Sequence, residues 1–216
     1  MNKKLCLVFV IGAFFSGVTQ ANDQSTVLSS IQSQWAEANY LIDNEKQKEA
    51  AFENLLRHAD EALASFPKSA EILIWHGIVN SSYAGVKGGL GALSLVKASR
   101  VDLEKALELN PLALDGSAYT SLGTLYFKVP GWPISFGDDD MAEELLKTAL
   151  TINPEGIDPN FFYAQYLLEQ GDEEEAKNHL LTASKAKPRL GRELADQGRQ
   201  SEIAKMLEAL RSEHVN

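Results

Sequence analysis

Apolar residues recur at intervals of three and four along most of the chain, which is the spacing of amphipathic α-helices. The sequence has no run of alternating apolar and polar residues long enough to predict a strand. The pattern predicts nine helices, at about 26–43, 46–65, 69–82, 91–109, 116–128, 139–151, 158–170, 173–186 and 199–213.

Four of these helices end in the same way, with an alanine five residues before a proline. The prolines are Pro67, Pro111, Pro154 and Pro188, which lie 44, 43 and 34 residues apart. A proline ends a helix because its ring removes a backbone donor and clashes with the preceding turn. Self-similarity near a 34-residue period is typical of helical repeat arrays, which present one long binding surface rather than an enzyme core.

The last repeat, residues 157–190, resembles a tetratricopeptide repeat in its small, apolar and proline positions, namely Ala164, Gly171, Ala176, Leu180, Ala183 and Pro188. The repeat before it contains Tyr119-x-x-Leu122-Gly123-x-x-Tyr126, which is similar to the family's first-helix signature. The resemblance implies an all-α fold, a right-handed α-α superhelix (TPR-like solenoid) of about four helix pairs. The repeats are expected at about 30–67, 70–111, 116–154 and 157–190, and an apolar stripe predicts a C-terminal capping helix within 192–213.

The N-terminal residues 1–21 have the pattern of a secretory signal peptide. Lys3 and Lys4 are followed by an apolar run over residues 5–15, and Thr19-Gln20-Ala21 predicts cleavage after Ala21. The apolar run is too short for a permanent membrane span. We therefore expect one exported, soluble domain over residues 22–216, located in a bacterial periplasm without stable membrane insertion.

Charge and motif content argue against several functions. The net charge is −10, and removal of Lys3 and Lys4 makes it more negative by two, so we expect no nucleic-acid partner. The four histidines lack zinc-ligand spacing, and no arrangement of nucleophile, base and oxyanion donors is present. The acidic run at residues 138–140 is interpreted as a helix cap, because Asp140-x-x-Glu143 has capping-box spacing. We expect no enzyme activity, no cofactor and no metal.

Two repeats are longer than the family's, and both insertions fall between the two helices of a pair. Parallel stacking of the repeats would place the two insertions on one edge, and such insertions often mark a binding face. The first, residues 83–97, contains Lys87 and a glycine-rich turn, interpreted as a structural loop or a local anion site. The second, residues 129–140, holds Trp132 between two prolines. The apolar residues of the first insertion, Leu90, Leu93, Leu95 and Val96, are interpreted as an extension of the helix that follows. Trp132 and Phe136 are interpreted either as partner contacts or as cover for this apolar extension.

In this family, first-helix side chains line an inner groove. Carried over by repeat position, they are Glu71, Ile74, Ile78 and Ser81, then Ser117, Thr120, Thr124 and Phe127, then Asp158, Phe161, Gln165 and Leu168. This set is mixed in polarity with little positive charge, which suits an uncharged extended peptide or an apolar helix.

The leading hypothesis is a non-enzymatic exported scaffold that binds another envelope protein or peptide through the concave groove and the inserted edge. The alternative is an accessory small-apolar-ligand-binding component of a periplasmic uptake system, since exported repeat proteins of this type resemble the T-components of such systems. The predicted contact residues are Trp132, Phe136, Ile74, Ile78, Thr120, Thr124, Phe127, Phe161, Gln165, Leu168 and Lys87.

Overall fold

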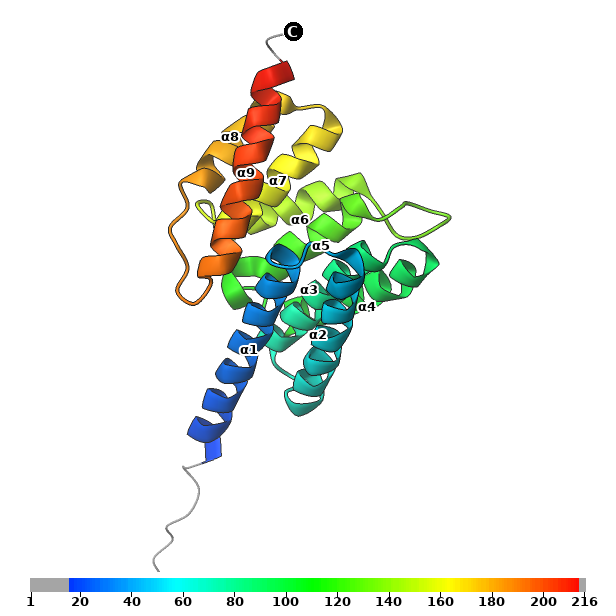
Figure 1. Ribbon diagram of the computed structural model, residues 1–216, viewed down its shortest axis with the longest axis vertical. Coiled ribbons are helices and arrows are strands. Elements are labelled where there is room, and N and C mark those ends of the chain that lie inside the picture. The colour runs from blue at the N-terminus through cyan, green and yellow to red at the C-terminus, as the bar shows by residue number, and fades with distance from the viewer. Residues whose placement is uncertain (1–15, 214–216) are drawn as a thin grey trace, which may run out of the picture.

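The protein is described here by a computed structural model, which covers the backbone of residues 16–213 and the side chains of residues 23–212. Most of the predicted signal peptide, residues 1–15, therefore lies outside the described residues. Helices fill the described part apart from short connections and one isolated bridge between Gly131 and Gly137, which confirms the all-α class (Figure 1). The helices are α1 (Ser16–Tyr40), α2 (Glu45–Ser65), α3 (Ala70–Lys87), α4 (Gly89–Leu109), the short η1 (Ala113–Gly116), α5 (Ser117–Lys128), α6 (Asp139–Ile152), α7 (Ile157–Gln170), α8 (Glu173–Ser184) and α9 (Glu193–Glu213).

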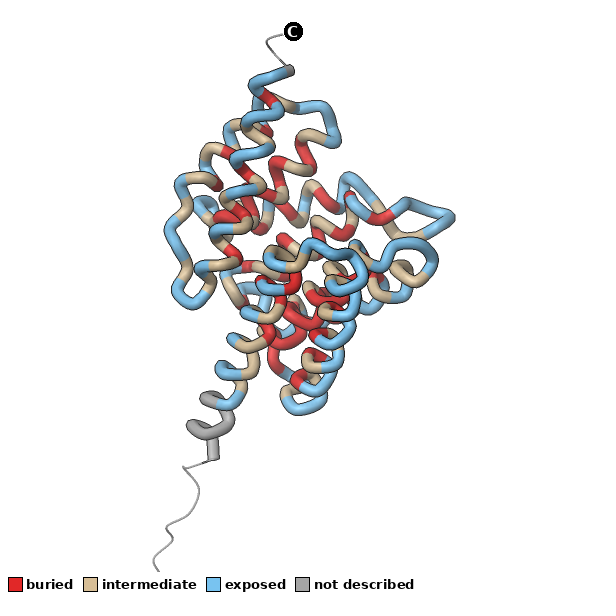
Figure 2. Tube along the Cα trace, viewed as in Figure 1, coloured by how far each residue is buried: buried red, intermediate tan, exposed pale blue. Residues whose placement is uncertain are grey.

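The helices pack as successive pairs. The most extensive contacts join α3 to α4, α5 to α6 and α7 to α8, and each pair then packs against the next. The first helices of the pairs also contact one another in the order α1, α3, α5 and α7, so they form a continuous row. Figure 2 shows the buried residues concentrated where the helices face each other.

Small residues let the paired helices cross closely. A Cβ added at Gly77 in α3 would lie 2.9 Å from Leu103 Cγ, and one added at Gly123 in α5 would lie 2.8 Å from Leu146 Cγ. Ser99 replaces the expected alanine in α4, and its fully buried hydroxyl donates to the carbonyl of Gly77 at 2.7 Å. A larger side chain at these crossings would force the helix axes apart. The alanines that precede the four prolines are all buried, at Ala62, Ala106, Ala149 and Ala183.

Two predicted helix boundaries were wrong, the end of the third helix and the start of the last one. The third helix was predicted to end at about 82, but α3 continues to Lys87, and α4 begins at Gly89 rather than at 91. Gly88 and Gly89 have φ of 62° and 58°, a region that side-chain-bearing residues rarely adopt, so the chain reverses in a single residue. The capping helix begins at Glu193 rather than at 199. It continues through Gly198, where a Cβ would lie 2.4 Å from the ring of Tyr40.

The acidic run before α6 acts as a helix start, but Asp138 is the cap rather than Asp140. The Asp138 carboxylate accepts a hydrogen bond from the backbone N–H of Met141 at 3.0 Å, and Asp139 and Asp140 follow in the first turn. No cluster of His, Cys, Asp or Glu side chains within the described residues could hold a metal ion. Among the helices of residues 16–213, none combines the length and apolarity needed to cross a bilayer.

A buried histidine ties three helices together. His76 in α3 lies 2.7 Å through Nδ1 from an Asp102 carboxylate oxygen on α4, and 2.8 Å through Nε2 from an Asp60 carboxylate oxygen on α2. Burial alone would lower the pKa of His76, but the hydrogen bonds to Asp102 and Asp60 and their charges outweigh burial and raise it. Both ring nitrogens then donate, so the imidazolium form is the one that this arrangement stabilises.

We predict that His76 stabilises the fold at low pH more than at high pH. Its pKa is higher in the folded chain than in the unfolded chain, so the stabilisation is complete below the unfolded value of about 6.5 and is lost as pH rises through the folded value. At pH 6.5, His76→Gln should cost about 2 kcal/mol, or roughly 4–8 °C in Tm. The Tm difference between wild type and variant should shrink as the pH is raised to 9. A difference that stays constant across this range would contradict the assignment of a protonated His76.

Candidate functional site: a cleft between the first and last helices

The row of first helices borders a cleft of about 1250 Å³. Side chains from α3, α5 and α7 line it, with contributions from α1, the start of α4, the 185–192 connection and α9. The cleft combines apolar side chains, such as Ile78, Val96 and Phe162, with hydroxyl groups, such as those of Thr120 and Thr124. A concave site of this volume and mixed lining is what ligand-binding and peptide-binding proteins present.

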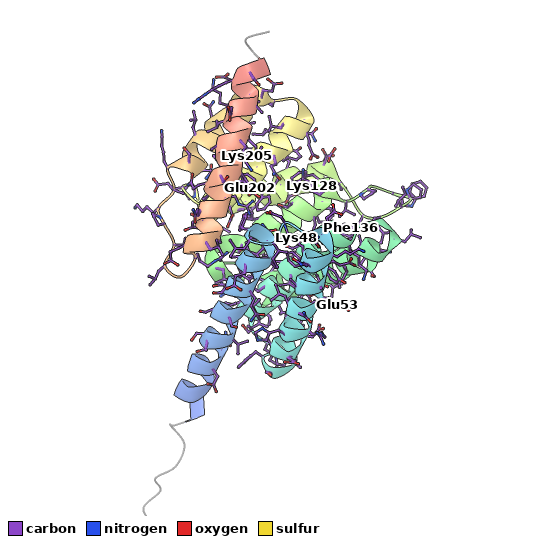
Figure 3. All side chains as sticks on the ribbon, in the orientation of Figure 1. Lys48, Glu53, Lys128, Phe136, Glu202 and Lys205 are labelled. Atoms are coloured by element: carbon purple, nitrogen blue, oxygen red, sulfur yellow. The ribbon has the colours of Figure 1, made fainter. Side chains whose placement is uncertain are left out.

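The last helix closes the repeat array onto its first helix. α9 contacts α8, α7 and α1, so it returns across the array instead of only extending it (Figure 1). The ring of Tyr40, at the end of α1, packs against Gly198 of α9, and its hydroxyl donates to Glu202 at 3.4 Å. Figure 3 labels Glu202 on α9. Burial, reinforced by the carboxylates of Glu202 and Asp158 against the opposing charge of Arg199, raises the pKa of Tyr40 to about 12, so the hydroxyl stays a donor at neutral pH.

An ion-pair cluster fixes α9 against α7 at one end of the cleft. The Asp158 carboxylate accepts from Arg189 Nη1 at 2.6 Å and from Arg199 Nε at 3.0 Å. Arg189 also pairs with Asp196, and Arg199 with Glu202. Burial alone would raise the pKa of Asp158, but the charges of Arg199 and Arg189 outweigh it and lower the pKa to about 2. The cluster is therefore fully charged at neutral pH, and it joins three segments distant in sequence.

Two tryptophans and an arginine form a second group in the cleft. The rings of Trp35 in α1 and Trp75 in α3 meet edge to face, with centroids 5.8 Å apart, and Trp35 Nε1 donates to Ser82 at 2.8 Å. The guanidinium of Arg192 lies over the Trp75 ring, 4.7 Å from its centroid. The Nε atom of Arg192 is buried and has no hydrogen-bond partner in the described part of the chain.

Only some of the predicted groove residues line this cleft. The residues that do are Ile78, Ser81, Ser117, Thr120, Thr124 and Asp158. Ile74, Phe127 and Phe161 lie in the core, with exposed fractions of 0, 8 and 1%. Gln165 and Leu168 are half-buried away from the lining.

Phe161 is covered because α9 folds over the groove side of α7, which places the Arg199 guanidinium 4.2 Å from the Phe161 ring centroid. Repeat position alone predicts that Phe161 lies in the open groove. The side chain is unavailable to a partner in this arrangement.

The two insertions lie beside each other, as their repeat positions predict. Phe136 packs against Tyr126 and under the guanidinium of Arg100 from α4, 5.0 Å from its centroid, so it folds back onto the protein (Figure 3). Trp132 is 90% exposed. Lys87 is exposed at the end of α3, where its ammonium group donates to the Tyr83 hydroxyl at 3.2 Å. On this edge, the Phe136 side chain therefore packs against the protein, whereas the Trp132 side chain is exposed to solvent.

The sequence analysis missed the tryptophan and arginine residues of the cleft. In the sequence, the positions of Trp35 in α1 and Trp75 in α3 are those of ordinary core residues. No local sequence pattern indicates that they lie near the 185–192 connection. The available signal was the run of Arg189, Arg192 and Arg199 in a chain of net charge −10. A cluster of basic residues in such an acidic chain indicates a local role for their charge.

Comparison with known proteins identifies the repeats. A sequence model described as tetratricopeptide repeat matches residues 135–210. The chain therefore contains a tetratricopeptide repeat segment over about a third of its length. Its helix pairs form the predicted tetratricopeptide-like superhelix, a fold that serves as a protein-interaction scaffold and is generally non-catalytic.

Solved tetratricopeptide repeat structures resemble the chain only distantly. A crystal structure of MamA is 16% identical with a TM-score of 0.46, over 80% of this chain and 95% of that one. The protein TTC0263 of Thermus thermophilus is 17% identical with a TM-score of 0.45, over 86% of this chain and 99% of that one. PilF of Pseudomonas aeruginosa is 13% identical with a TM-score of 0.39, over 89% of this chain and 93% of that one. These similarities carry no functional argument, and no curated protein matches the chain.

Proposed function

We propose that this tetratricopeptide repeat protein is a non-enzymatic exported scaffold whose cleft binds an extended segment of another cell-envelope protein. The observation that carries the proposal is the cleft itself, which runs along the first helices of successive pairs. Its mixture of apolar and hydroxyl side chains suits an extended peptide, which presents apolar side chains and a backbone that needs hydrogen-bonding partners. The N-terminal pattern of residues 1–21 supports export to a periplasm.

The edge formed by the 129–138 loop supplies a second contact in this proposal. Trp132 is 90% exposed and Ile134 is 63% exposed beside it, which is unusual for large apolar side chains at the tip of a loop. Aromatic anchors often dominate the energetics of protein interfaces. A partner that fills the cleft and reaches this edge would bury the side chains of Trp132 and Ile134.

The cleft proposal predicts position-dependent crosslinking. A photo-reactive amino acid replacing Thr124, which lines the cleft, should give a discrete adduct with one envelope protein when the full chain is expressed in its own cell. The same replacement at Glu144, exposed on α6, is the matched control and should give none. Mass spectrometry of the adducts would identify the partner peptide. Adducts at Glu144 with none at Thr124 would contradict cleft binding.

The return of α9 to α1 favours a second candidate, a carrier of a small apolar ligand in a periplasmic uptake system. The contact between α9 and α1 bounds the cleft, and the cleft volume of about 1250 Å³ is somewhat larger than that of most ligand pockets, which are roughly 300–1000 Å³. Ile78, Leu93, Val96, Leu125 and Phe162 supply apolar surface for such a ligand.

A carrier should retain its ligand through gentle purification. Native mass spectrometry of the protein taken from its own compartment should then show an excess of roughly a few hundred daltons that is lost on denaturation. Thr124→Arg should remove the excess by filling the cleft, whereas Thr151→Arg, on the exposed face of α6, should keep it. A native mass equal to the bare chain would count against the carrier.

A further inference from the structure

Three arginines line the cleft, and one of them differs from the others. Arg189 and Arg199 are held by carboxylates, Arg189 by Asp158 and Asp196 and Arg199 by Asp158 and Glu202. Arg192 has no ion pair with any residue that the structure describes, and its buried Nε has no hydrogen-bond partner there. A buried donor of this kind is costly to leave unpaired.

Although Arg192 has no ion pair within the described residues, its guanidinium is held in a defined position. Its guanidinium stacks on Trp75, 4.7 Å from the ring centroid, and Trp75 is 3% exposed and held in turn by the ring of Trp35. Stacking of a guanidinium on an aromatic face leaves the N–H donors in the guanidinium plane free for hydrogen bonds. Arg192 is thus a preorganised fork of donors rather than a mobile surface charge.

The electrostatics of the cleft contrast with those of the whole chain. The chain has a net charge of −10, yet six basic side chains line the cleft against three acidic ones. Ion pairs account for Lys128, Arg189 and Arg199, which leaves Arg192, Lys185 and Lys187 facing Asp115 and Glu155. Burial, followed by the neighbouring charge of Arg189, lowers the pKa of Arg192. An anion in the cleft would relieve both effects.

We propose that the cleft binds a small carboxylic acid with an apolar body, and that the carboxylate pairs with Arg192. A planar carboxylate matches the guanidinium fork in two parallel hydrogen bonds. A single negative charge fits an excess of one basic side chain, and the apolar body lies against the apolar part of the lining, which includes Ile78, Val96 and Phe162. This assignment rests on the small-ligand form of the proposed function and names the chemical class of its ligand.

The test compares two probes that differ only in the head group, which is a carboxylate in one and an uncharged hydroxyl in the other. Decanoate and decan-1-ol share an apolar chain, and their binding to the purified, ligand-free protein at pH 8 can be followed by calorimetry and by tryptophan fluorescence. Wild-type protein should bind decanoate at least tenfold more tightly than decan-1-ol. Arg192→Gln should weaken decanoate binding about tenfold or more and leave decan-1-ol binding unchanged. Arg211→Gln, which removes an exposed charge from α9, should change neither.

The possible outcomes distinguish failure of the carboxylate assignment from failure of the small-ligand function on which it rests. Equal affinity of wild-type protein for the two probes would overturn the role of Arg192 while leaving apolar ligand binding in place. Binding of neither probe would overturn both. Arg192→Lys keeps the charge without the fork, so an affinity for decanoate between those of wild type and Arg192→Gln supports the bidentate geometry. The comparison of probes on wild-type protein stands even where Arg192→Gln fails to fold.

Discussion

Close crossing of the paired helices is the constraint on which the rest of the structure depends. At Gly77 and Gly123 there is no room for a Cβ, so α3 and α4, and likewise α5 and α6, approach until a leucine of one helix touches the backbone of the other. This approach aligns the first helices in one row and the second helices in another. The row of first helices is what the cleft is built on, and its side chains face the cleft only because the pairs are stacked in register.

The return of α9 to α1 bounds this row and makes it one side of a cleft. A helix that only capped the array would cover the last pair and leave the groove open along its length. Here Gly198 meets the ring of Tyr40, while Asp158 joins Arg189 and Arg199 across three segments. The same ion pairs hold two of the arginines of the cleft, whereas Arg192 has no ion pair within the part of the chain that the structure describes.

The repeated alanine and proline positions were enough to predict the fold class, because each reflects a local rule of helix crossing or helix ending. The groove residues were harder to predict. Repeat position placed Ile74 and Phe161 in the groove, but it cannot show that α9 covers Phe161. The juxtaposition of Trp75 with Arg192 depends on the curvature of the whole array, which sums small rotations at every pair and has no local sequence signal.

The central claim is that the cleft between the row of first helices and α9 is the binding site. A crystal structure of the protein purified from its own compartment, without added ligand, tests it most directly. A binding cleft predicts additional electron density inside the lining, in contact with Trp75 and Arg192, from a peptide segment or a small molecule. An occupant bound on the outer face of α2, α4 or α6, with the cleft holding solvent alone, would contradict the claim.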